Sequence, residues 1–209
     1  MDTEVLNKCR GWLTELFQAR IHGRGGQGVV TAAEILSIAA FIEGKYAQAF
    51  PTFGSERMGA PVTAYCRIDN HPIRLREPVV TPDALIIQDA TLLHRVPVFQ
   101  GLADSGYVLI NSAQSIPDLG IGELVKPLPP EHCCTLPATA LGLEHIGRPI
   151  PNSALLGGFA AMTQLLKFES VAAAIASKFP GSLGEKNVAA ASAAYRLGME
   201  RTTAHAKAS

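Results

Sequence analysis

A glycine-rich loop near the start of the chain has the residue types and spacing of a phosphate-binding site. The loop consists of Gly23, Arg24, Gly25, Gly26, Gln27 and Gly28, which contain the pattern G-x-G-x-x-G. Glycines let the backbone approach a phosphate closely, and a helix that begins after them offers N–H groups without intrahelical partners. The arginine and the glutamine add a cation and an amide. We therefore expect this loop to bind an anionic group.

The same pattern has two other interpretations. A site for a nicotinamide dinucleotide needs an acidic residue near the end of the second strand, where it binds a ribose hydroxyl. The expected second strand, residues 46–50, contains no acid, and Glu43 precedes it. Alternatively, the glycines only form a tight turn against a sheet. The loop taken alone leaves these possibilities open.

A second polar loop, within residues 50–61, carries further candidate residues. Ser55, Glu56 and Arg57 supply a hydroxyl, a carboxylate and a guanidinium between two expected strands. Arg57 and Arg24 could together hold a phosphate, because a guanidinium group binds anions through two donors at once. Equally, Glu56 and Arg57 could form an ordinary ion pair on the surface or with another subunit.

Other kinds of reactive site are not indicated. The six histidines are scattered, so we predict no metal site, and the sequence contains neither a P-loop motif nor a G-x-S-x-G motif. No two cysteines have C-x-x-C spacing, which argues against an iron–sulfur cluster or a zinc ribbon on this chain. The four cysteines are Cys9, Cys66, Cys133 and Cys134. We expect the adjacent pair to be buried in the core.

The elements that would position the glycine loop are a short strand at 19–22 before it and an amphipathic helix at 29–43 after it. Hydrophobic patterns predict further strands at 46–50, 60–68, 73–75, 83–88, 107–111, 126–128 and 133–136. Further helices are expected at 4–18, 91–102, 154–166, 171–179 and 185–199. Strands mixed with helices in this order predict an α/β fold: one Rossmann-like three-layer domain with a mixed sheet and a helical C-terminal part. We expect a helical extension at 1–18, the domain at 19–200 and an irregular tail at 201–209.

Composition narrows the classes of partner. The 209 residues include 18 basic and 18 acidic side chains, so the net charge is zero and binding to nucleic acid is disfavoured. The chain has no secretory signal and no apolar stretch long enough to span a membrane, which favours the cytoplasm. Only 17% of the residues are charged and 47% are hydrophobic. This balance suits a subunit with permanent contacts to other chains.

Several strings in the sequence resemble the γ subunit of pyruvate and related 2-oxoacid:ferredoxin oxidoreductases. They are the segments 21–28, 45–51, 54–62, 72–76, 88–89 and 179–189, and the resemblance extends in order over residues 19–200. It implies a complex of α, β, γ and δ chains that decarboxylates a 2-oxoacid oxidatively and transfers the acyl group to coenzyme A. Electrons would pass to ferredoxin or another acceptor.

The resemblance also assigns the cofactors. The sequence lacks the thiamine diphosphate motif and the cluster-binding cysteine run, so thiamine diphosphate, Mg²⁺ and the [4Fe-4S] clusters are expected on partner subunits. This chain would contribute to the architecture and to part of the coenzyme A site, through the glycine loop and Ser55, Glu56 and Arg57. A purely structural subunit remains the main alternative, and a free-standing dinucleotide-binding module is another. The sequence does not identify the oxoacid.

Overall fold

The computed structural model describes residues 16–52 and 58–208. Most of the helix expected at 4–18 lies outside these residues. Its last part is not helical, however, because Phe17 and Gln18 are the first residues of a β-strand that pairs with Ile68 and Arg67. None of the helices in the described part of the chain is long and apolar enough to cross a membrane.

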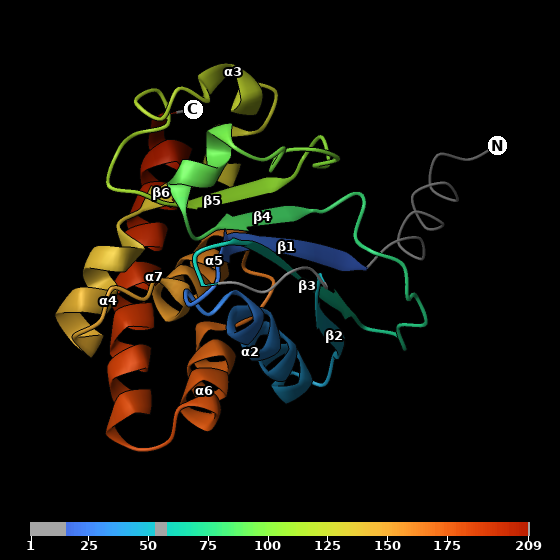
Figure 1. The fold of residues 1–209 in the computed structure, drawn as a ribbon, viewed down its shortest axis with the longest axis vertical. Helices are drawn as coiled ribbons and strands as arrows, with labels where there is room; N and C mark the ends of the chain where they lie inside the picture. The colour runs from blue at the N-terminus through green and yellow to red at the C-terminus, as the bar shows by residue number, and fades with distance from the viewer. Residues whose placement is uncertain (1–15, 53–57, 209) are drawn as a thin grey trace.

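The centre of the molecule is a six-stranded mixed sheet, in agreement with the α/β fold expected from the sequence. The strands, in spatial order, are β2 (Tyr46–Pro51), β3 (Pro61–Asp69), β1 (Phe17–Arg24), β4 (Ala84–Ile87), β5 (Tyr107–Asn111) and β6 (Cys133–Leu136). Strands β1, β4, β5 and β6 are mutually parallel, whereas β3 runs antiparallel to both β1 and β2 (Figure 1).

Helices cover the two faces of this sheet unequally. The large hydrophobic core lies on one face, between the sheet and the long helices; a smaller core lies on the other face, under η1 and α3 (Figure 1). The long helices are α2 (Val29–Ile42), α4 (Ala138–Ile146), α5 (Asn152–Thr163), α6 (Phe168–Lys178) and α7 (Ser182–Ala208). The short ones are η1 (Ala90–His94), α3 (Gly122–Val125) and η2 (Pro130–His132).

Small residues allow α5 to pack in the middle of the large core. The helix is buried over nearly its whole length because it lies between the sheet and α7. A Cβ atom on Gly157 would lie 2.0 Å from the backbone oxygen of Ala191 in α7, and one on Gly158 would lie 2.2 Å from the Leu136 side chain in β6. The glycine-rich sequence of α5 therefore serves close packing.

Several predicted elements are wrong or differ in length. Residues 73–75 form no strand, since carbonyl groups in the segment 73–77 accept hydrogen bonds from side chains on the sheet instead of from a neighbouring strand. The helix expected at 91–102 is only the 3₁₀ turn η1, and residues 126–128 follow α3 as a turn. Pro97 stops η1 from continuing. Helix α7 continues to Ala208, so residues 201–208 are helical and do not form the irregular tail expected from the sequence.

Candidate functional site

The glycine loop connects the carboxyl end of β1 to the first turn of α2, as predicted. Gly26 and Gly28 adopt φ angles of 95° and 73°, in the left-handed region that favours glycine. Gly28 is the residue before the helix, and the first intrahelical hydrogen bond is donated by Ala32 N to its carbonyl oxygen. The N–H groups of the first helical turn therefore have no intrahelical acceptor. No acidic side chain lies in that turn, and no side chain caps it.

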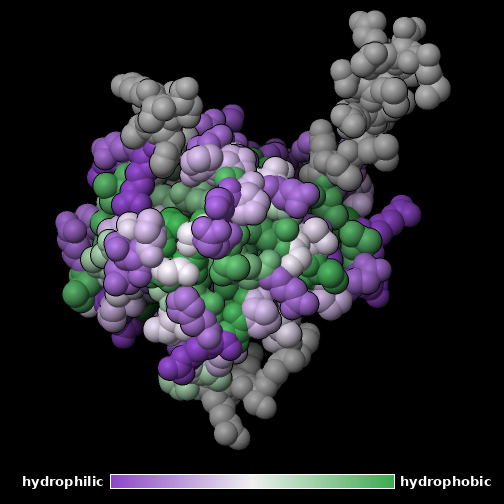
Figure 2. Space-filling model, turned by 90° about the horizontal axis from the view of Figure 1, so that it is seen from above, coloured by the Kyte–Doolittle hydropathy of each residue, from purple (hydrophilic) through white to green (hydrophobic). Residues whose placement is uncertain are grey.

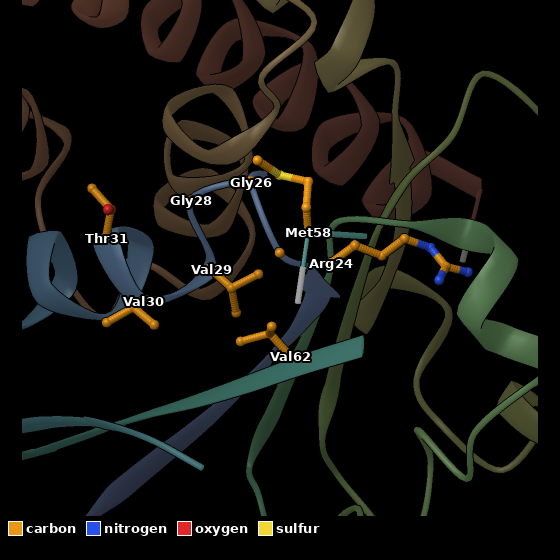
Figure 3. A pocket seen from close by; sticks show the side chains of 9 residues that line it. Arg24, Gly26, Gly28, Val29, Val30, Thr31, Met58 and Val62 are labelled. Atoms are coloured by element: carbon orange, nitrogen blue, oxygen red, sulfur yellow. The ribbon is translucent and has the colours of Figure 1, made fainter. Parts of the chain in front are cut away.

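A pocket of about 500 Å³ opens beside this helix end. Its lining residues are Arg24, Gly25, Gly26, Gly28, Val29, Val30, Thr31, Met58 and Val62. Figure 3 shows Val29, Val62 and Met58 around the pocket, with Met58 close to Gly26. The pocket thus combines apolar walls with the positive end of a helix dipole, which suits a ligand with an anionic group joined to an apolar one.

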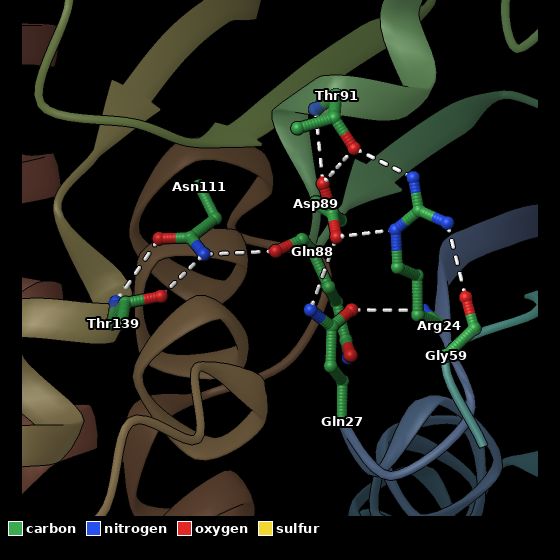
Figure 4. Close-up of polar contacts among 8 residues, drawn as sticks. All are labelled: Arg24, Gln27, Gly59, Gln88, Asp89, Thr91, Asn111 and Thr139. Carbon is green, nitrogen blue, oxygen red and sulfur yellow. Dashed lines mark hydrogen bonds and ion pairs between the residues drawn. The ribbon is translucent and has the colours of Figure 1, made fainter. Parts of the chain in front are cut away.

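Arg24 lies beside the pocket, but its guanidinium group is turned away from Val29 and Val62 (Figure 3). Nε donates to Asp89 Oδ2 at 2.8 Å, one terminal nitrogen donates to the Gly59 carbonyl at 3.0 Å and the other to Thr91 Oγ1 at 2.7 Å. These contacts link the glycine loop to the loop that precedes β3 and to the residues that follow β4 (Figure 4). The Arg24 side chain therefore fixes the position of the loop.

Asp89 is the acidic partner of Arg24 at this site, and it lies outside both of the polar loops predicted to bind a ligand. Burial alone would raise the pKa of its carboxyl group. Hydrogen bonds from Thr91 and Arg24 and the charge of Arg24 outweigh burial and lower the pKa below its ordinary value. Gln27 joins the same group: its Nε2 donates to Asp89 Oδ2 at 3.3 Å and its Oε1 accepts from Arg24 N at 2.8 Å. The site is thus a connected polar network (Figure 4).

A sequence signal for Asp89 does exist. It follows β4, which is parallel to β1 and its direct neighbour, so both carboxyl ends meet at one edge of the sheet. The chain leaves β1 toward the large core through α2 and leaves β4 toward the small core through η1. Ligands of open α/β sheets bind at such a reversal between neighbouring strands. A polar residue directly after the buried strand Ala84–Ile87 was therefore a candidate.

Further polar residues lie at the same edge of the sheet as Arg24 and Asp89. Asn111, at the end of β5, donates to the Gln88 carbonyl at 2.8 Å and to Thr139 Oγ1 at 2.7 Å (Figure 4). Gln88 is fully buried, and neither its amide nitrogen nor its amide oxygen has a hydrogen-bond partner among the described residues. Asn152, at the start of α5, is 3% exposed, and its Nδ2 would lie 2.5 Å from a Cβ atom on Gly28.

The second predicted loop is only partly described. Ser55, Glu56 and Arg57 lie outside the described residues, so their roles remain predictions. The end of that loop does meet the first motif, because Gly25 N donates to the Ala60 carbonyl at 2.9 Å and Gly59 N donates to the Gly25 carbonyl at 3.2 Å. The glycine loop and the end of the second polar loop are therefore neighbours in space.

Three alternative chemistries, namely dinucleotide binding, thiol catalysis and metal binding, gain no support from the described residues. The second strand of a dinucleotide-binding fold lies next to the first, but here β3 separates β2 from β1. The thiols are poorly suited to reaction, since burial raises the pKa of Cys66 to about 12 and that of Cys133 to about 11. Within residues 16–52 and 58–201, no cluster of histidine, cysteine or acidic residues could hold a metal ion.

Comparison with known proteins identifies the family. The model of the pyruvate ferredoxin/flavodoxin oxidoreductase family matches residues 18–197. The chain belongs to this family. The common subunit gamma of the pyruvate/ketoisovalerate oxidoreductases from Pyrococcus furiosus is 49% identical over 180 residues, which span 86% of this chain and 96% of that protein. Pyruvate synthase subunit PorC from Methanocaldococcus jannaschii is 48% identical over the same shares of both chains.

A solved structure of this family has the same fold. The crystal structure of pyruvate oxidoreductase subunit PORC from Thermotoga maritima superposes with a TM-score of 0.74 at 32% identity. The match covers 88% of this chain and 97% of that one. The resemblance to a family γ subunit, stated from the sequence, is therefore confirmed, and the chain corresponds to a non-autonomous oxidoreductase subunit.

Proposed function

We propose that this chain works as the γ subunit of a cytoplasmic complex that converts a 2-oxoacid to an acyl-coenzyme A. Its gamma-subunit and PorC relatives support this role, because they match it over nearly their whole length. The partners would be the α, β and δ subunits or their fused equivalents, with ferredoxin or another protein as electron acceptor. Thiamine diphosphate, Mg²⁺ and the [4Fe-4S] clusters would belong to those partners, since this sequence has no motif for them.

Within the complex, we propose that the glycine loop binds part of coenzyme A. The observation that carries this proposal is the pocket at the first turn of α2, where backbone N–H groups face a space without acidic side chains. These N–H groups would receive a phosphate of coenzyme A. Val29, Val62 and Met58 would contact its apolar pantetheine arm.

Arg24 has a positioning role in this proposal. All three nitrogens of its guanidinium group already donate to Asp89, Gly59 and Thr91. A direct contact with phosphate would require this group to leave a partly buried ion pair. We therefore assign Arg24 to holding the loop in the shape that exposes its N–H groups. The contribution of Arg57 to phosphate binding remains as predicted from the sequence.

The surface supports a role within an assembly. Large apolar side chains are exposed at several places, among them Phe41 at 78%, Met58 at 88% and Leu124 at 56%. On the face seen in Figure 2, the side on which α3 lies, apolar residues gather between polar ones. Single exposed apolar residues are ordinary, whereas apolar residues that gather on one face are typical of a protein contact.

The test compares two glycine variants in the assembled complex. Gly26→Ala places a side chain at φ 95° with its Cβ 2.9 Å from the Met58 sulfur, inside the pocket. Gly44→Ala is the matched control, because Gly44 has φ 74° at the other end of α2 and open space around it. We expect Gly26→Ala to raise the KM for coenzyme A at least 10-fold and to leave the KM for the oxoacid unchanged.

The control variant should leave both constants unchanged while losing about 1–2 kcal/mol of stability, the cost of a left-handed alanine. Equal, small effects of both variants on coenzyme A would favour a purely structural subunit whose glycine loop only forms a turn.

A further inference from the structure

The face of the sheet opposite the large hydrophobic core is polar over the half formed by β1, β3 and β2. No helix in the described part of the chain covers this half. Strand register places β1 and β3 side chains together there: Gln18 beside Arg67, Arg20 beside Tyr65, and His22 beside Thr63. On the adjoining β4 the residues of this face are Leu85 and Ile87, which belong to the small hydrophobic core. The polar half is therefore confined to β1, β3 and β2.

This polar face contains buried positive charge. Arg67 is 2% exposed and Arg20 8% exposed, and neither forms an ion pair with a carboxylate of residues 16–52 or 58–201. Arg20 donates to the carbonyls of Val98 and Gln100, and Arg67 donates to Gln18 Oε1 and to the Glu77 carbonyl. These acceptors are neutral, and Arg67 also lies over the Phe50 ring, 5.2 Å from its centroid, so no carboxylate among the described side chains balances either guanidinium group.

Three donor or acceptor atoms on this face are also unused. They are Arg20 Nε, one terminal nitrogen of Arg67 and His22 Nε2, each buried without a hydrogen-bond partner among the described residues. Burial and then the charge of Arg20 lower the pKa of His22 to about 4. These groups are too buried to touch another molecule, but their positive charge adds to the electrostatic potential at the surface that covers them.

A segment with further basic residues borders this face. Residues 73–82, named here the basic strap, form the loop between β3 and β4 on the right of Figure 1. Sheet side chains hold the strap, since Gln48 donates to the Ile73 carbonyl and Gln18 donates to the Thr81 carbonyl.

The strap presents two exposed arginines, Arg74 and Arg76, and only one acidic residue, Glu77. Leu75 and Val80 are 42% and 73% exposed between them. No ion pair forms between these two arginines and any carboxylate that the structure describes. The strap itself thus carries more positive than negative charge, and the acids that flank it in the sequence are Asp69 and Asp83.

We propose that the basic strap binds an acidic polypeptide segment of another subunit of the complex, and that the buried arginines of the polar face add to the positive potential of the strap. The proposal rests on the proposed function, because it needs a partner subunit. Exposed arginines would steer and pair with carboxylates of that segment, and Leu75 and Val80 would contact its apolar residues. Charge complementarity selects an acidic partner, and the arginine-rich composition matches that of protein interfaces.

Zero-length cross-linking in the assembled complex tests this proposal. Arg74→Lys and Arg76→Lys keep the charge and introduce an amine, which a carbodiimide joins to a neighbouring carboxylate. Arg148→Lys is the matched control, because Arg148 is exposed on the loop between α4 and α5. We expect the strap lysines to link to Asp or Glu residues of one partner subunit, and the control to form no such link.

Charge reversal provides the second measurement. Arg74→Glu with Arg76→Glu should weaken binding of this chain to its partners roughly 10- to 100-fold at low salt, and less at high salt. Links from the strap only to this chain's own acids, such as Glu56 or Glu77, or unchanged assembly of the reversal variant, would overturn the proposal. If the wild-type chain failed to assemble at all, the proposed function itself would be wrong, so the two failures are distinguishable.

Discussion

Replacing Arg24 with alanine removes the side chain that ties the glycine loop to the end of β4. Three hydrogen bonds are lost, and Asp89 keeps its contacts with Thr91 and Gln27. Hydrogen bonds that involve a charged group contribute about 1.5–3 kcal/mol each where the partner is left buried. Water reaches part of this pair, since the side chains of Arg24 and Asp89 are 23% and 14% exposed. We therefore expect a total loss of about 2 kcal/mol.

Thermal unfolding of the purified chain measures this loss. For a chain of this length, about 2 kcal/mol corresponds to a fall in Tm of roughly 4–8 °C. Arg95→Ala is the control, because Arg95 is exposed next to η1 and its side chain makes no ion pair among the described residues. The control should leave Tm within about 1 °C of wild type.

The variant Asp89→Asn distinguishes two roles of Arg24: holding the glycine loop in place, and contacting a phosphate of coenzyme A directly. If Arg24 positions the loop, losing the charge of Asp89 should raise the KM for coenzyme A in the assembled complex. The double variant with Arg24→Ala should then be no worse than Arg24→Ala alone, because both changes break one interaction. If Arg24 binds phosphate directly, Asp89→Asn frees the guanidinium and tightens coenzyme A binding. That tightening would refute the positioning role.

Three further predictions concern other parts of the fold. Gly28→Ala should lower Tm more than Gly44→Ala, because both positions have positive φ but only the Gly28 Cβ would meet Asn152, at 2.5 Å; equal losses would contradict this. Cys66 should resist alkylation at pH 8 in the folded chain and react after denaturation, since burial raises its pKa to about 12; rapid reaction of the native thiol would show that the strand opens. Because the pKa of His22 is lowered to about 4 from an ordinary 6.5, the folded state binds fewer protons than the unfolded state between these values, and stability should fall as pH drops through that window. His22→Gln should flatten this dependence, as measured by urea unfolding at several pH values, whereas an unchanged slope would assign the acid sensitivity to other groups.

Local patterns in the sequence predict the elements around the site well. The glycine loop lies between a strand and a helix, and α2 ends at Ile42, one residue from the expected end. The apolar run Ala84–Ile87 is a strand buried on both faces, as its composition indicates. Such features depend on neighbouring residues, and so short-range periodicity reveals them.

Features that depend on distant residues were missed. The segment 73–75 has the composition of a strand, but side chains of Gln48 and Arg67 bind the carbonyls of Ile73 and Glu77 and hold the segment away from strand pairing. The pairing of Arg24 with Asp89, 65 residues later, depends on strand order, which the pattern of one chain does not supply. Tertiary contacts of this kind override local propensity.

The most direct test of the coenzyme A proposal is hydrogen–deuterium exchange of residues 24–31 in the assembled complex, with and without coenzyme A. If the unpaired N–H groups at the start of α2 bind a phosphate, adding coenzyme A should slow exchange in this peptide by an order of magnitude or more. Peptides around Gly44, at the other end of the same helix, should be unaffected. Protection elsewhere in the complex with unchanged exchange at 24–31 would contradict the account.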